Sequence, residues 1–149
     1  MKHLGLLAAT LLAAGCGAAG GAAPSEEPGR AMQRLIKYEL AGRLEQSYAM
    51  LVRQQRDVVE KNLYVRCPPG PPIGGVTVLV LAVSDETIEV PGLGPTKTKA
   101  VRWRMTLPDA QGDPLSQSDT GHLIAQDGQW RWTLSKSSFE SFKQRVCPY

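Results

Sequence analysis

The spacing of apolar residues divides the chain into a helical part and a strand-forming part. From Arg30 onward, apolar side chains recur at steps of three and four residues, as on one face of an amphipathic helix. These positions are Met32, Leu35, Ile36, Leu40, Leu44, Tyr48, Leu51 and Val52. Gly42 interrupts the stripe, so the pattern predicts either a kink or two helices, over about 30–41 and 43–53. A third short helix is predicted from Leu63 to Cys67.

After a loop at Gly70–Gly75, the apolar period shortens to two or disappears. The β-branched run Val76–Val83 is apolar on both faces and predicts a strand covered on both sides. A short edge strand is predicted at Thr87–Val90, with Asp85 and Glu86 in a solvated turn between the two. Clean alternation predicts a further strand between Lys97 and Leu107.

A hairpin is predicted where Asp127-Gly128 joins the strands Thr120–Gln126 and Gln129–Leu134. With these two residues in the turn, Leu123 lies opposite Trp132 and Ala125 opposite Trp130. Directly opposite residues share one face of a sheet. The register therefore turns both tryptophans inward and sends another set outward: His122, Ile124, Arg131 and Thr133.

Helical spacing returns at Phe139, Phe142 and Val146 and predicts a short C-terminal helix. Helices followed by strands indicate an α+β fold. We expect N-terminal helices packed on a curved antiparallel sheet, with the last helix closing the domain.

The N-terminus has the pattern of an export signal. Lys2 supplies a positive charge, Leu4–Ala14 is an apolar run, and Ala13-Ala14-Gly15 are small residues ahead of a cut. The run is too short for a bilayer, which needs about 20 apolar residues. We therefore expect residues 1–15 to be removed and the protein to act outside the cytoplasm.

Cys16 directly follows this apolar run. The stretch Leu11–Cys16 resembles the lipobox of bacterial lipoproteins, in which the cysteine carries lipid and becomes the first mature residue. The alternative is a secreted protein cut after Ala18-Ala19-Gly20. Residues 16–29 are rich in Gly and Ala and predict a flexible tether, and residues 30–149 predict one compact domain.

Charge and cysteine content narrow the class of protein. The net charge of +3 is far below that of a typical nucleic-acid binder, so we expect no nucleic-acid partner. Setting Cys16 aside leaves Cys67 and Cys147, which predict one disulfide in an oxidising compartment. The competing hypothesis, a metal or catalytic thiol, would need more ligands than His122 supplies.

Three stretches together carry a family resemblance: Leu40–Cys67, Thr120–Ser135 and Phe142–Pro148. Their order resembles the nuclear transport factor two-like superfamily, especially its exported, lipid-anchored members. The resemblance implies a cone-shaped α+β domain, and members of this superfamily often dimerise through the sheet surface. It implies little about activity, because the superfamily holds isomerases, dehydratases and carriers alike.

The sequence carries no strong catalytic or cofactor motif. A Gly-x-Ser-x-Gly elbow and a phosphate-binding glycine loop are both missing. The inward strand positions hold no group that could move a proton, and His122 faces outward by the register. We therefore expect no enzymatic activity and no cofactor.

Two groups of side chains are candidates for binding. Trp103, Trp130 and Trp132 face inward and form either core or an aromatic pocket, to which Tyr48 would add a polar group. Arg102, Arg104 and Arg131 face outward and form either a solvated sheet face or a surface for an anionic partner.

These observations predict a lipid-anchored, extracytoplasmic binding or interaction module of the cell envelope. Its expected partners are the membrane, through the N-terminal lipid, an envelope protein or anionic polymer, and a second copy of the chain. The alternatives are a small-molecule carrier with an aromatic pocket and an isomerase- or hydrolase-type enzyme. A buried acid or histidine would favour the enzyme, and an open cavity among the tryptophans would favour the carrier.

Overall fold

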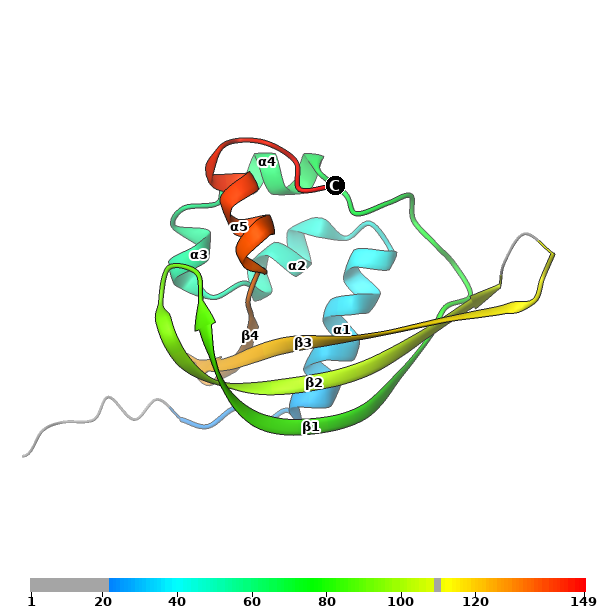
Figure 1. Cartoon of the computed structure of the whole chain (residues 1–149), viewed down its shortest axis with the longest axis horizontal. Coiled ribbons are helices and arrows are strands. Elements are labelled where there is room, and N and C mark those ends of the chain that lie inside the picture. Colours follow the sequence, from blue (N-terminus) through cyan, green and yellow to red (C-terminus); the bar gives the residue numbers. More distant parts are fainter. Residues whose placement is uncertain (1–21, 109–110) are drawn as a thin grey trace, which may run out of the picture.

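Among the described residues, four helices precede four strands, and one helix follows them (Figure 1). The structure is a computed structural model that describes residues 22–108 and 111–149. The predicted signal and Cys16 lie outside these residues. The elements are α1 (Pro28–Leu40), α2 (Leu44–Met50), α3 (Arg53–Arg56), α4 (Lys61–Arg66), β1 (Thr77–Val90), β2 (Gly94–Pro108), β3 (Pro114–Gln126), β4 (Gln129–Trp132) and α5 (Lys136–Lys143).

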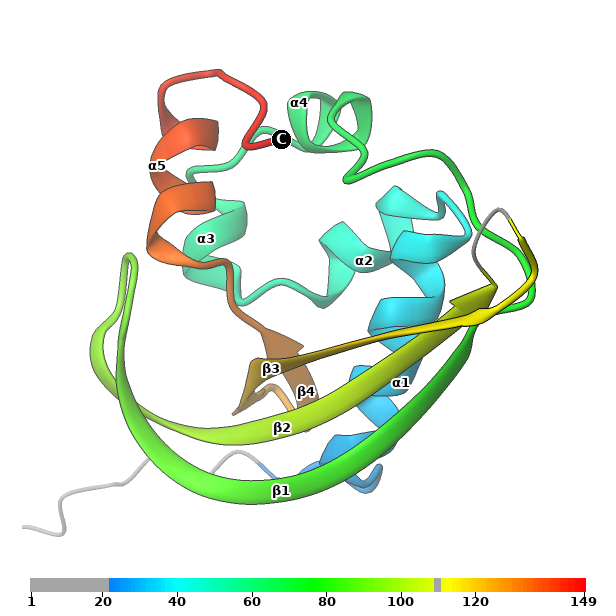
Figure 2. The same cartoon turned by 45° about the vertical axis from the view of Figure 1, so that its right-hand side comes forward.

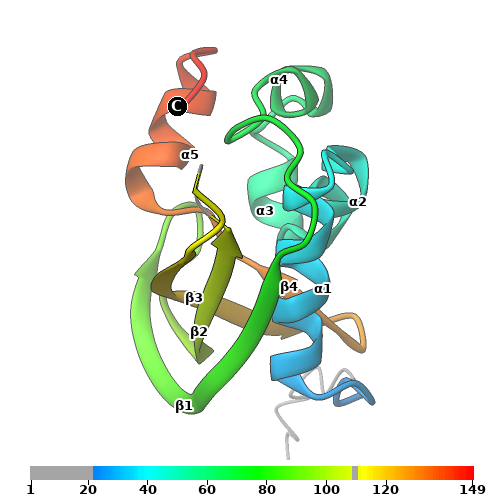
Figure 3. The same cartoon turned by 90° about the vertical axis from the view of Figure 1, so that its right-hand side faces the viewer.

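The strands form one antiparallel sheet in the order β1-β2-β3-β4. The sheet is strongly curved (Figure 2). Seen from the side, α1 runs along the sheet while the other helices gather at one end (Figure 3). The α+β class and the curved antiparallel sheet predicted from the sequence are confirmed.

The β3–β4 hairpin has the predicted register. Leu123 pairs with Trp132, and Ala125 pairs with Trp130. The turn residues Asp127 and Gly128 have φ angles of 54° and 70°, the left-handed conformation that a two-residue type I′ turn requires.

The β1 strand differs from its prediction. Residues expected to form two strands form one, because β1 pairs with β2 continuously from Thr77 to Val90 with a bulge between Val80 and Ala82. Within the described chain, the outer face of β1 is open: Leu79 is 54% exposed and Val83 45%. β1 is an edge strand. A central strand has a paired strand on each side, whereas one side of β1 has none.

The turn after α1 is a Schellman motif centred on Gly42, whose φ is 68°. The amide of Arg43 donates to the carbonyl of Tyr38 at 2.7 Å, and the amide of Gly42 donates to that of Glu39 at 3.1 Å. Gly42 thus ends α1 and separates it from α2, as the two-helix alternative predicts.

The predicted second helix is shorter than expected. It ends at Met50 because Leu51 and Val52 adopt extended conformations. Leu51 bridges to Trp132, and the amide of Val52 donates to the Trp132 carbonyl at 3.0 Å. Pairing with β4 therefore overrides helical spacing at these two residues.

Two clusters of buried side chains form the core. The helical cluster joins α2, α4 and α5 and contains Leu44, Leu51, Val59, Leu63, Tyr64, Cys67, Leu134, Phe139 and Phe142. The sheet cluster lies between α1 and the sheet and contains Ala31, Met32, Leu35, Ile36, Met50, Val78, Val101 and Leu123. Trp132 packs against both clusters and so connects the two halves of the domain.

The predicted disulfide is confirmed. Cys67, after α4, is bonded to Cys147, after α5, with 5.3 Å between the Cα atoms. The bond closes a loop with a sequence separation of 80 residues. It ties the end of the chain to the start of the loop that leads into β1.

Candidate functional site

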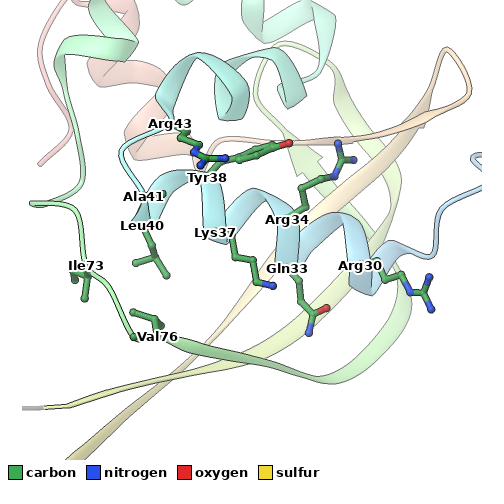
Figure 4. A pocket seen from close by; sticks show the side chains of 11 residues that line it. Arg30, Gln33, Arg34, Lys37, Tyr38, Leu40, Ala41, Arg43, Ile73 and Val76 are labelled. Atoms are coloured by element: carbon green, nitrogen blue, oxygen red, sulfur yellow. The ribbon is translucent and has the colours of Figure 1, made fainter. Parts of the chain in front are cut away.

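A groove of about 600 Å³ runs beside α1 and is the strongest candidate for a binding site (Figure 4). Its size falls in the range of small-molecule sites. The groove is bordered by the exposed face of α1, the turn after α1 and the segment before β1. Its lining residues are Arg30, Gln33, Arg34, Lys37, Tyr38, Leu40, Ala41, Arg43, Ile73, Gly75 and Val76.

The amphipathic pattern of α1 places basic residues in this groove. Met32, Leu35 and Ile36 are buried against the sheet. The opposite stripe of the helix carries Arg30, Arg34 and Lys37 at spacings of four and three residues, which brings them to one face. Burial of the apolar stripe therefore directs these three cations into the groove.

The Schellman turn brings a fourth cation to the groove. Because the Arg43 amide bonds back to the Tyr38 carbonyl, the chain reverses over the last turn of α1. Arg43 and Tyr38 both line this part of the groove (Figure 4).

One end of the groove is apolar. The amide of Ile73 donates to the carbonyl of Leu40 at 2.9 Å, which fixes the segment before β1 against the end of α1. Leu40, Ile73 and Val76 lie together at this end, while Arg30 lies at the other (Figure 4). Ile73 is 38% exposed, so it presents apolar surface to solvent.

Most of the positive charge in the groove is not neutralised by the protein. Arg34 pairs with Glu26 at 2.7 Å. Within residues 22–108 and 111–149, Arg30, Lys37 and Arg43 form no ion pair, and no acidic side chain lines the groove. The arrangement can therefore bind an anion.

The tryptophans are partly buried against the sheet cluster and do not line this groove. Trp103, Trp130 and Trp132 all pack against the sheet cluster. The Trp130 indole donates to the carbonyl of Glu26 at 2.6 Å, and the Trp132 indole donates to that of Ser47 at 3.0 Å. Backbone carbonyls thus satisfy both indole N–H groups, which favours the core interpretation of these residues.

Tyr48 does not offer a polar group to the tryptophans. Its hydroxyl donates to the Val59 carbonyl at 2.9 Å and lies 3.1 Å from that of Arg56. This contact holds α2 to the connection between α3 and α4.

The three candidate arginines of the sheet face are not equivalent. Arg102 and Arg104 are exposed on β2, where the Arg104 Nε donates to the Ser118 hydroxyl at 3.4 Å. Arg131 is partly buried and donates to the Ala49 carbonyl at 2.7 Å, and burial lowers the pKa of its guanidinium. Only the first two therefore present free charge to a partner.

His122 has a carboxylate neighbour that the sequence did not suggest. Its Nε2 lies 3.2 Å from Glu86 Oε2, while the adjacent Asp85 pairs with Lys99 at 2.7 Å. Asp85 and Glu86 lie within β1, so their placement in a turn was wrong. In the described part of the chain, no three His, Cys, Asp or Glu side chains gather as a metal site.

A buried polar link, missed from the sequence, joins α1, α2 and α4. The Tyr64 hydroxyl donates to Glu39 Oε1 at 2.8 Å and lies 3.0 Å from the Ser47 hydroxyl. Burial raises the pKa of the Glu39 carboxyl and of the Tyr64 hydroxyl. The sequence did carry a signal for this link: Glu39 follows Ile36 by three residues and Leu35 by four, which places it at the edge of the apolar stripe of the helix.

Glu39 in this link is an acid of the kind that would favour an enzyme. The hydroxyls of Ser47 and Tyr64 that contact each other beside it are too buried for a substrate to reach them. Ser47 is 0% exposed and Tyr64 4%. The geometry therefore suits a structural connection between helices, and acid–base chemistry would need access to a substrate.

Comparison with known proteins does not assign the chain to a family. No protein-family model matches the chain, and no curated protein matches it either. Among the described helices, none has the length and apolar character required to cross a membrane.

Proposed function

We propose that this protein is a non-enzymatic binding module of the cell envelope, held on a membrane through lipid on Cys16, and that its α1 groove binds an anionic ligand. The observation that carries the proposal is that Arg30, Lys37 and Arg43 all line one groove and form no ion pair within the described residues. Hydrogen bonds between ionised partners are stronger than neutral ones.

The sequence supports the address of this module. An apolar run that stops at Cys16 fits export and lipidation, and the Gly/Ala-rich tether fits a domain held close to the membrane surface. The nuclear transport factor two-like cone and a homodimer belong to the same proposal, supported by the order of helices and strands.

A small-molecule carrier is the second candidate. The observation that favours it is the groove itself, whose volume suits a compact ligand. In this version of the carrier hypothesis the ligand lies beside α1, and the tryptophans contribute to the core.

A titration with inorganic pyrophosphate, followed by amide chemical shifts, tests anion binding. We expect the largest chemical-shift changes at Lys37, Arg43 and their neighbours. These changes should disappear in the double variant Lys37→Gln/Arg43→Gln. The double variant Arg102→Gln/Arg104→Gln removes the same charge from the sheet and serves as the control. Loss of the chemical-shift changes in Arg102→Gln/Arg104→Gln, with their retention in Lys37→Gln/Arg43→Gln, would contradict the proposal.

The lipid anchor is tested separately by cell fractionation. We expect Cys16→Ser to move the protein from the membrane fraction to the soluble extracytoplasmic fraction, because several acyl chains together provide the anchor. Unchanged membrane retention would disprove lipidation at Cys16 without affecting the groove.

A further inference from the structure

We propose that the ligand of the α1 groove is an anionic amphiphile with a single acyl chain and a phosphate or carboxylate headgroup. This inference rests on the proposed function, because it specifies the ligand of the same groove. The feature that points to it is the division of the groove into a cationic part and an apolar end.

The cationic part suits a negatively charged headgroup. Lys37 and Arg43 approach the groove from α1 and from the turn that follows it, and neither has an acidic partner among the described residues. A guanidinium can bind a phosphate or carboxylate through two parallel hydrogen bonds, while an ammonium adds a point charge.

The apolar end suits a hydrocarbon chain. Leu40, Ile73 and Val76 converge there (Figure 4). Each methylene that leaves water on this surface contributes about 0.8 kcal/mol. A polyanion would leave this end without a matching group, so the groove as a whole favours an amphiphile.

The two walls are fixed relative to each other before any ligand binds. The Ile73–Leu40 hydrogen bond holds the apolar wall, and the Schellman turn at Gly42 holds Arg43. An extra Cβ on Gly42 would lie 3.3 Å from Pro72 Cγ, so the turn and the segment before β1 are already in close contact. A preformed groove loses less entropy on binding than one that must be ordered.

Calorimetric titration with palmitoyl-lysophosphatidylglycerol, below its critical micelle concentration, tests this inference. Two comparison ligands separate the groove's two parts. Glycerol phosphate has the headgroup chemistry without the chain, and palmitoyl-lysophosphatidylcholine has the chain with no net charge. We expect both to bind at least about tenfold more weakly than the anionic lysolipid.

Variants assign the binding to the groove. Lys37→Gln/Arg43→Gln is expected to weaken binding of the anionic lysolipid about tenfold. Ile73→Asn, at an exposed position, is expected to weaken lysolipid binding while leaving glycerol phosphate binding unchanged. Arg102→Gln/Arg104→Gln removes two charges from the sheet and should leave all affinities unchanged.

The outcomes separate this inference from the broader proposal. Equal affinity for glycerol phosphate and the anionic lysolipid would overturn the amphiphile and leave anion binding intact. Equal affinity for the two lysolipids would show that charge plays no part and would overturn both. An equal loss from the sheet double variant would show non-specific attraction and also overturn both.

Discussion

The α1 groove and the outer surface of the sheet both carry basic side chains, but they differ in shape. On the sheet, Arg131 is turned onto the α2 backbone, while Arg102 and Arg104 are exposed on β2. In the groove, Lys37 and Arg43 meet no acid within the described chain and face an apolar wall. A basic face thus becomes a candidate site when a second segment encloses it and leaves its charge available.

Removing the disulfide should have the largest effect and should act on the groove more than on the sheet. Cys67 immediately precedes the segment that supplies Ile73 and Val76, so the bond restrains one wall of the groove. For a loop of this length, the loss of the bond is expected to lower the free energy of unfolding by about 4–5 kcal/mol.

Chemical unfolding of Cys67→Ala/Cys147→Ala measures this loss. Amide hydrogen exchange locates it, and we expect faster exchange in α4 and the segment before β1 than in the β2–β3 ladder. Uniform acceleration over the whole domain would contradict a local role of the bond at the groove.

Two glycines provide a matched test of intermediate size. Gly42 and Gly128 have φ angles of 68° and 70°, and an alanine in this region costs about 1–2 kcal/mol at either position. Gly42 shapes the groove, whereas Gly128 lies in the hairpin turn of the sheet. We expect a loss of stability from both Gly42→Ala and Gly128→Ala, somewhat larger for Gly42→Ala because its Cβ would lie 3.3 Å from Pro72 Cγ. Lysolipid binding should weaken only in Gly42→Ala.

Denaturant unfolding and calorimetric titration of both variants check this prediction. Weaker binding in both variants would show that affinity follows general stability. In that case the precise placement of Arg43 would be unimportant for the ligand.

Local sequence signals predicted the parts of the fold that depend on neighbouring residues. Asp127-Gly128 predicted the hairpin register, Gly42 predicted the end of α1, and the cysteine count predicted the disulfide. Leu51 and Val52 could not be placed this way, because their conformation depends on pairing with Trp132 far along the chain.

The candidate site was only half visible in the sequence. The stripe of Arg30, Arg34 and Lys37 is a local pattern, but it is indistinguishable from a solvated helix face until the opposite wall is known. That wall comes from Ile73 and Val76, more than thirty residues later. The sheet arginines were the more conspicuous pattern because strand alternation marks them, yet alternation carries no information about cavities.

The smallest expected effect concerns pH and the polar link formed by Glu39, Tyr64 and Ser47. Glu39 lies between the groove residues Tyr38 and Leu40, and burial raises the pKa of its carboxyl from 4.5. Between the unfolded and the folded pKa, the folded state binds more protons than the unfolded state at this site. Its contribution to stability therefore falls as pH rises through this interval and is constant above it.

Glu39→Gln should remove this dependence, since an amide does not titrate and can still accept the hydrogen bond from Tyr64. Urea unfolding of both proteins from acidic to neutral pH gives the difference in free energy directly. We expect the variant to gain stability relative to the parent as pH rises. Glu140→Gln, on the solvent-exposed side of α5, controls for the loss of a charge. A difference that does not change with pH would mean that the Glu39 carboxyl is solvated, and that its pKa is not raised in the folded protein.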